Sequence, residues 1–153
     1  MVFKGESKMK LAFYVDTNGG TPLNTEIYNF LNENIDELED AAVFFENTNF
    51  NPVQVKFGMF DAADIWSFSG DLVCTSPSSF AKARNVVNDQ KICYMFDSSQ
   101  KREESLFDLF WISQSVKVFV NNETDANIFY RITGVKPVNI EGFNLSKLKE
   151  VFQ

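Results

Sequence analysis

A chain of 153 residues has the usual length of one domain, and its 44% hydrophobic residues, including 17 Phe, suffice for a core without metals or disulfides. The formal net charge of −7 disfavours nucleic acid and anionic membranes as partners, because both require a basic surface. The absence of histidine removes most zinc sites and every Ser–His or Cys–His couple.

Apolar runs alternate with helical patterns from the start of the chain. The run 11–15 ends in a turn-rich loop over 16–20. A helix is predicted next, because Thr21 can cap it and Pro22 suits its first turn. Its buried face is predicted to hold Leu23, Ile27, Phe30 and Leu31, which recur at helical spacing. Next we expect strands over 42–45 and 53–60, a helical turn over 61–66, and a strand over 71–75.

The second half of the chain continues the alternation. A break at 76–78 caps a helix whose inner stripe is Phe80, Ala83 and Val87. The elements predicted after it are a strand over 92–96, a helix with Leu106, Leu109, Phe110 and Ser113 on one side, a strand over 116–120, a helix over 126–132 closed by Gly134, a strand over 135–140, and a helix over 145–152 capped by Asn144 or Ser146.

The strands are short and continuously apolar, which is typical of a parallel sheet covered by helices on both faces. We therefore predict a doubly wound, Rossmann-like α/β fold with a mainly parallel sheet of about six to seven strands. A single domain is expected over 9–153, after an N-terminal extension over 1–8. Cys74 and Cys93 lie in apolar runs and are interpreted as buried free thiols of a reducing compartment. With no signal peptide or membrane span in the sequence, a cytoplasmic location is expected.

Ligands of doubly wound sheets bind outside the carboxyl ends of the strands, near the point where strand order reverses. The loops there are small and polar. Gly19 and Gly20 precede a helix N-terminus, whose free amides favour a phosphate or sugar oxygen. An ordinary loop with a positive φ at Gly19 or Gly20 is the alternative. The predicted ligand-binding residues are Asp16, Thr17, Asn18, Gly19, Gly20, Ser76, Ser78, Asp97 and Ser98.

Asp16 and Asp97 are the candidates for a catalytic role, and Asp16 could accept hydrogen bonds from ligand hydroxyls. Two acids at neighbouring strand ends could also hold magnesium, as in response-regulator receivers or haloacid-type phosphatases. That interpretation lacks a second acid beside Asp16 and a strand-end lysine, so neither a metal nor a cofactor is predicted. The capping of helices or loops is the alternative role of both acids.

Three segments, 9–31, 70–99 and 116–152, resemble in order and spacing the N-terminal domain of GT-B glycosyltransferases. The first contains the strand, Gly-Gly loop and helix start FYVDTNGGTP, and the last contains the turn 141–144 before a helix. In that family two Rossmann-like domains face each other, with the acceptor mostly on the first and the nucleotide sugar mostly on the second. The resemblance implies an acceptor-side domain that is not catalytic alone. It matches Gly19 and Gly20 to the loop that approaches the donor phosphates.

The leading hypothesis is a glycosyltransferase-like domain that binds a sugar, a nucleotide sugar or a protein partner at the strand ends. One alternative is an interaction module whose exposed aromatic residues meet a protein partner or a second copy. Another is a small transferase or hydrolase that uses Asp16 and Asp97. Abundant Asn, Asp and Phe would suit an AT-rich or viral genome, such as that of a phage.

Overall fold

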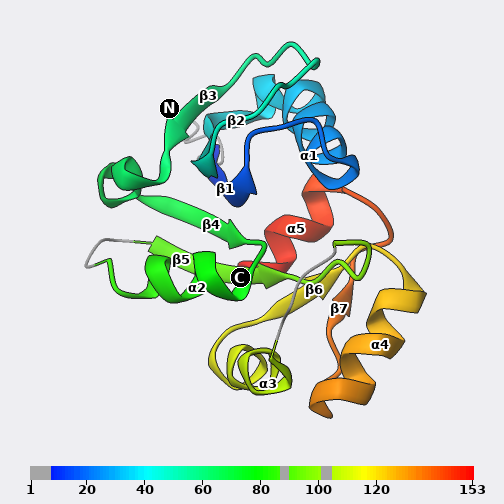
Figure 1. The fold of residues 1–153 in the computed structure, drawn as a ribbon. Coiled ribbons are helices and arrows are strands. Elements are labelled where there is room, and N and C mark those ends of the chain that lie inside the picture. The colour runs from blue at the N-terminus through cyan, green and yellow to red at the C-terminus, as the bar shows by residue number, and fades with distance from the viewer. Residues whose placement is uncertain (1–7, 87–89, 101–104) are drawn as a thin grey trace, which may run out of the picture.

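The computed structural model describes residues 8–86, 90–100 and 105–153 (Figure 1). They form a seven-stranded sheet with the order β3-β2-β1-β4-β5-β6-β7, in which every neighbouring pair is parallel. The strands are β1 (Met9–Thr17), β2 (Leu38–Asn47), β3 (Gly58–Asp61), β4 (Gly70–Cys74), β5 (Gln90–Met95), β6 (Val118–Val120) and β7 (Val138–Asn139). The helices are α1 (Pro22–Glu33), η1 (Ile35–Glu37), η2 (Ala62–Ser67), α2 (Pro77–Arg84), α3 (Leu106–Ser115), α4 (Glu123–Thr133) and α5 (Leu145–Val151). The predicted doubly wound α/β fold is confirmed.

The strand order reverses between β1 and β4. From β1 the chain winds outward to β3, returns through η2, and places β4 on the other side of β1. The pairing aligns Leu11 with Asp71 and Tyr14 with Cys74. From β4 the chain winds outward again to β7, so β1 and β4 form the central pair from which both halves of the sheet extend.

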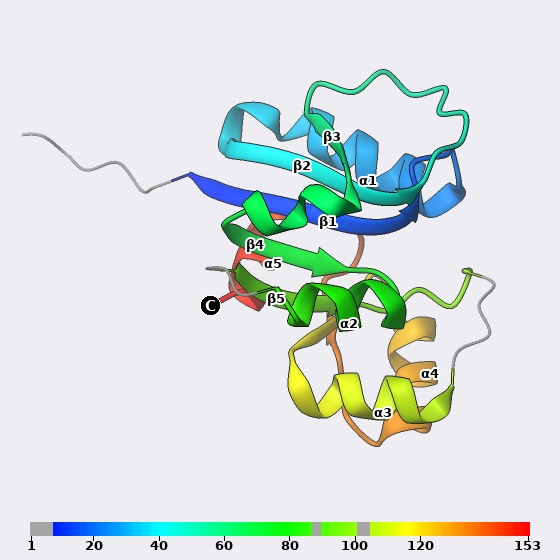
Figure 2. The same ribbon diagram turned by 60° about the vertical axis from the view of Figure 1, so that its left-hand side comes forward.

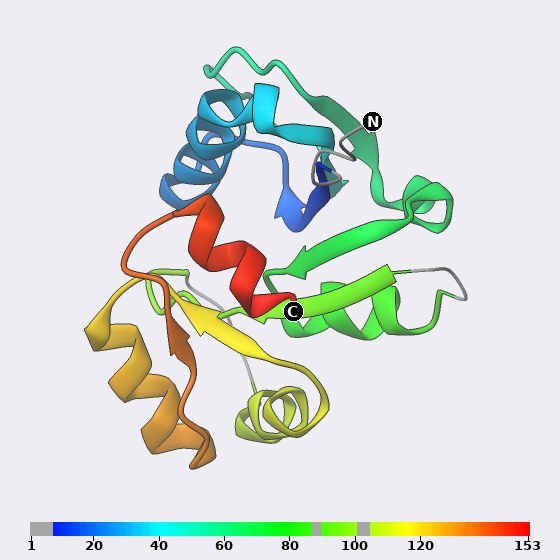
Figure 3. The same ribbon diagram turned by 180° about the vertical axis from the view of Figure 1, so that it is seen from behind.

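Helices cover both faces of the sheet, and each face has its own apolar core. On one face, Leu11, Phe13 and Val15 of β1 pack with residues of α1 and α5, which lie side by side in Figure 3. On the other face, Ala12 and Tyr14 pack with residues of η2, α2, α3 and α4; Figure 2 shows α2 in front of β5 and α3 below it. Because successive side chains of a strand point to opposite faces, one continuously apolar strand serves both cores.

Side-chain caps begin the helices where the sequence predicts them. The Thr21 hydroxyl accepts from the Asn24 amide at the start of α1. Ser76 and Ser79 form a reciprocal capping box at the start of α2. Asn144, rather than Ser146, caps α5, and Gly134 ends α4 with a left-handed φ of 74°. These caps fix the helix N-termini at the carboxyl edge of the sheet.

The predicted strand over 53–60 is wrong for its first half, because β3 begins only at Gly58. Asn32 of α1 takes the place of a neighbouring strand: its amide nitrogen donates to the Gln54 carbonyl at 2.7 Å, and its oxygen accepts from the Lys56 amide at 2.8 Å. Backbone groups satisfied by a side chain need no ladder partner. The predicted strand over 135–140 is likewise reduced to Val138–Asn139.

The side of α3 that carries Leu106, Leu109, Phe110 and Ser113 is not its buried face. Leu109 and Ile112 are the buried residues of α3, whereas Leu106 and Phe110 are exposed. Leu109 and Ile112 lie three residues apart and face the core that α3 shares with α4. In α2, Phe80 and Ala83 are buried as predicted, and Val87 lies outside the described residues.

Both cysteines are buried free thiols, as predicted. The parallel register pairs Val73 with Cys93 and Cys74 with Tyr94, so the two thiols belong to opposite cores. In the part of the chain that the structure describes, no helix combines the length and apolar character needed to cross a bilayer.

Candidate functional site

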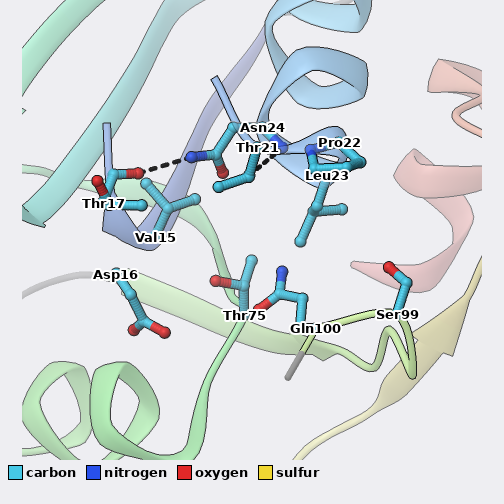
Figure 4. A pocket seen from close by; sticks show the side chains of 10 residues that line it. All are labelled: Val15, Asp16, Thr17, Thr21, Pro22, Leu23, Asn24, Thr75, Ser99 and Gln100. Carbon is cyan, nitrogen blue, oxygen red and sulfur yellow. Dashed lines mark hydrogen bonds between the residues drawn. The ribbon is translucent and has the colours of Figure 1, made fainter. Parts of the chain in front are cut away.

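A pocket of about 310 Å³ opens at the carboxyl ends of β1 and β4, where the strand order reverses. Figure 4 shows the start of α1 on one side of it, Asp16 and Thr75 at the strand ends, and Ser99 and Gln100 from the loop after β5. Its lining residues are Val15, Asp16, Thr17, Thr21, Pro22, Leu23, Asn24, Thr75, Ser99 and Gln100. This crevice is the place where doubly wound folds bind their ligands.

Hydrogen bonds within the protein hold the walls of this switch-point pocket. The buried Asn24 amide donates to the carbonyls of Thr17 at 2.7 Å and Gly19 at 2.9 Å, which ties α1 to the loop after β1. The buried Thr75 hydroxyl donates to the Tyr14 carbonyl at 2.8 Å, which ties the end of β4 to β1. These two parts of the wall are therefore held by the protein's own hydrogen bonds.

The hydroxyls of Thr17 and Thr21 act as acceptors inside the protein. Thr17 Oγ1 accepts from the Gly19 amide at 3.1 Å and from Asn49 Nδ2 at 2.7 Å, and Thr21 Oγ1 accepts from the Asn24 amide at 3.1 Å. A hydroxyl has one hydrogen to donate, and these contacts leave that hydrogen for a ligand oxygen. The pocket lining thus contains two hydroxyl groups that can donate and the Asp16 carboxylate, which is an acceptor.

Asn18, Gly19 and Gly20 do not line this pocket. The Gly19 amide donates to Thr17 Oγ1, and the Gly20 amide donates to the Phe50 carbonyl at 3.0 Å. Asn18 Oδ1 accepts from the Asn49 amide at 2.6 Å. The predicted free amides therefore have partners within the protein. The alternative of a positive φ is also wrong, because the described glycines with that conformation are Gly70, Gly134 and Gly142.

The other predicted site residues lie in two wider hollows along the same edge of the sheet. Ser76 and Ser78, with Asp16 again, line a hollow of about 850 Å³ beside α2 and α3. Asp97 and Ser98 line a second one of about 830 Å³ near the start of α4. Ser98 donates a hydrogen bond to the buried Asp125, and Asp97 accepts from the Ser99 amide at 2.8 Å.

Asp16 and Asp97 are not at neighbouring strand ends, as the magnesium hypothesis required. β4 lies between β1 and β5, and the two acids line different hollows. Asp16 instead accepts a hydrogen bond from the Ser76 hydroxyl at 2.8 Å. Within the described ranges, no three His, Cys, Asp or Glu side chains are grouped so that they could hold a metal ion.

The described residues along this edge of the sheet carry more negative than positive charge. Among the described residues that line the three hollows, the single cation is Lys82. Its ammonium group lies 2.7 Å from Glu46 Oε1. The carboxylates that line them are Asp16, Glu26, Glu33, Glu46, Asp97, Asp108 and Asp125. An anionic ligand would meet repulsion here, whereas a neutral ligand with many hydroxyls would meet acceptors.

Glu46 is held as a carboxylate by two donors. Partial burial raises its pKa, but hydrogen bonds from Lys82 and Tyr14 outweigh this and bring the pKa below the usual value of 4.5. Burial, and then the bond to Glu46, raise the pKa of the Tyr14 hydroxyl. The phenol therefore stays protonated and donates to the carboxylate.

Several lining residues were not predicted. Thr75 is the last residue of the strand predicted over 71–75, so its position at a strand end was a signal for it. Thr21 was predicted only as the helix cap, and Asn24 was given no role. That both line the pocket depends on how α1 packs against β1. Gln100 comes from a loop that only the folded chain brings to β1 and β4, and no local pattern marks it.

Comparisons with protein-family models, with curated proteins and with solved structures found no match to this chain.

Proposed function

We propose that this chain is a glycosyltransferase-like domain that binds a sugar in the switch-point pocket and does not transfer it alone. The observation that carries the proposal is the coincidence of three features at one place: the reversal of strand order, a pocket of about 310 Å³, and a lining that contains the Thr17 and Thr21 hydroxyls together with the Asp16 carboxylate. A sugar offers adjacent hydroxyls that can donate to Asp16 and accept from Thr17 and Thr21.

The charge distribution favours a neutral sugar over a nucleotide sugar. A diphosphate is normally bound by cations or free backbone amides. Lys82 is paired with Glu46, and the amides of Gly19 and Gly20 have internal partners. Of the ligands expected from the sequence, the neutral sugar therefore has the better chemical fit.

The test is a thermal-shift panel of neutral mono- and disaccharides, nucleotide diphosphate sugars and inorganic diphosphate. A ligand at about 100-fold excess over its Kd stabilises the native state by about 2.7 kcal/mol, which is easily detected. We expect a shift with at least one neutral sugar and none with diphosphate. A shift with diphosphate alone, or none with any sugar, would contradict the proposal.

A pair of variants links the shift to the pocket. Asp16→Asn should weaken sugar binding by at least about tenfold, because hydrogen bonds to charged groups contribute about 1.5–3 kcal/mol. Asp40→Asn removes the same charge from an exposed residue near the amino end of β2 and should bind as the wild type does. Equal weakening in both variants would indicate a general charge effect and not a site.

A further inference from the structure

The surface of α3 is apolar on the side that faces away from the core. Leu106, Phe107, Phe110 and Trp111 are 65%, 84%, 50% and 42% exposed, respectively. At 100° per residue they form one continuous stripe, while Leu109 and Ile112 on the other side are buried. A helix that is apolar all round is normally buried, yet α3 lies at the outer edge of the molecule (Figures 1 and 2).

We propose that this stripe is the contact surface of a homodimer, in which α3 of one copy packs antiparallel against α3 of a second copy. A two-fold axis between Phe107 and Phe110 places Phe107 of each copy against Phe110 of the other. The same axis brings the Leu106 edge of one stripe against the Leu106 edge of the other, and the Trp111 edge against the Trp111 edge. The large residues of the stripe are thus all covered by equivalent residues, as a self-complementary interface requires.

The area of the stripe fits a dimer. Large side chains such as these bury about 150–250 Å² each, so the exposed parts of these four residues amount to about 350–600 Å². An interface of ordinary size buries about 800 Å² per partner, of which about 56–65% is apolar. The stripe therefore supplies the apolar share of one such interface.

The charges beside the stripe are also self-complementary. Asp108 precedes Trp111 by one turn on α3, and the Arg84 guanidinium lies over the Trp111 ring, 5.3 Å from its centre. Both charged residues are exposed on the Trp111 side of the stripe. In an antiparallel pair this side of one copy faces the same side of the other, so Asp108 of each copy lies on the side of its partner's Arg84.

The decisive measurement is the molar mass in solution by sedimentation velocity, from about 1 to 100 μM, a range that detects micromolar Kd values. At the highest concentration, the molar mass of the wild-type protein should approach twice the 17.5 kDa of one chain. Phe107→Glu should weaken association by at least about tenfold, because it puts two carboxylates into the centre of the contact. Phe50→Glu is the matched control: Phe50 is 83% exposed but lies in the loop before β3, and this variant should dimerise normally.

Cysteine crosslinking tests the antiparallel orientation, because both native thiols are buried. Phe107→Cys should form an intermolecular disulfide under mild oxidation. Gln114→Cys should not, because the two Gln114 residues would lie about 16 Å apart along the helix axes. A monomer at all concentrations, dissociation by Phe50→Glu to the same extent, or a Gln114→Cys crosslink would overturn the proposal. None of these results depends on sugar binding, so this proposal and the proposed function can fail separately.

Discussion

The hydroxyl of Ser76 donates a hydrogen bond to the Asp16 carboxylate at 2.8 Å, which joins the carboxyl ends of β4 and β1 across the point of order reversal. Ser76 also caps α2 by accepting from the Ser79 amide at 3.1 Å. One side chain thus fixes both a helix start and the carboxylate at the pocket. Its loss should affect stability and ligand binding together.

Ser76→Ala should lower the free energy of unfolding by about 1–2 kcal/mol, as expected for the loss of an N-cap. Urea unfolding would measure this loss, and an unchanged m-value would show that only the stability has changed. Ser78→Ala is the matched control, because Ser78 is exposed on the same helix turn and should stay within about 0.5 kcal/mol of the wild type. Equal stability of the two variants would mean that the Ser76 cap contributes nothing.

Acid should destabilise the protein in part through Glu46. Its pKa in the folded state lies below 4.5, so the contribution of the carboxylate is complete above about pH 4.5 and is lost as the pH falls through the lower, folded value. Glu46→Gln should therefore make the free energy of unfolding less dependent on pH below 4.5. Urea titrations at several pH values would measure this, with Glu39→Gln on the same strand as the control that retains the wild-type slope.

The two thiols should be unreactive in the folded protein. Burial raises the pKa of Cys93 to about 12, and burial also raises the pKa of Cys74. Because the thiolate is the reactive form, an aromatic disulfide reagent at pH 8 should label neither cysteine in native buffer and both in denaturant. Rapid labelling of one thiol in native buffer would show that its strand opens locally.

Gly20 is required by close packing. A Cβ atom at Gly20 would come within 2.7 Å of Pro52 Cδ, so Gly20→Ala should destabilise the protein by about 1–3 kcal/mol. Pro52→Ala removes that atom, and the double variant should recover part of the loss. The coupling free energy from a double-mutant cycle measures the contact. Additive effects of the two substitutions would mean that the clash is relieved by movement elsewhere.

The elements that the sequence predicts well are those whose signals are local. β1 and α1 follow from an apolar run, a cap at Thr21 and helical spacing, and the left-handed end of α4 follows from Gly134. The segment 53–57 was predicted as a strand because its composition suits one. Its backbone partner, the side chain of Asn32, comes from another element, and no pattern within the segment indicates it.

At the site, too, the residues with local signals were predicted, and those whose partners come from another segment were not. Asp16 and Thr17 were predicted from their position at a strand end, and both line the pocket. Asn18 and Gly20 lie in the same loop, but their polar groups form hydrogen bonds with Asn49 and Phe50 of the segment that follows β2. For α3, apolar residues all round the helix conceal which side faces the core, because hydrophobicity alone cannot separate a core face from a contact surface.

The strand order has a consequence for how the molecule could open. Residues 9–61 build one side of the sheet and residues 70–139 build the other, so the pocket lies on a seam between two portions that are each continuous in sequence. Within the sheet, the portions meet along a single strand pair over Leu11–Tyr14 and Asp71–Cys74. A ligand bound between Thr21 and Thr75 would contact both portions and hold them together. A chain cut in the connection at 68–69 could then be reassembled from two pieces, with the ligand favouring their reunion.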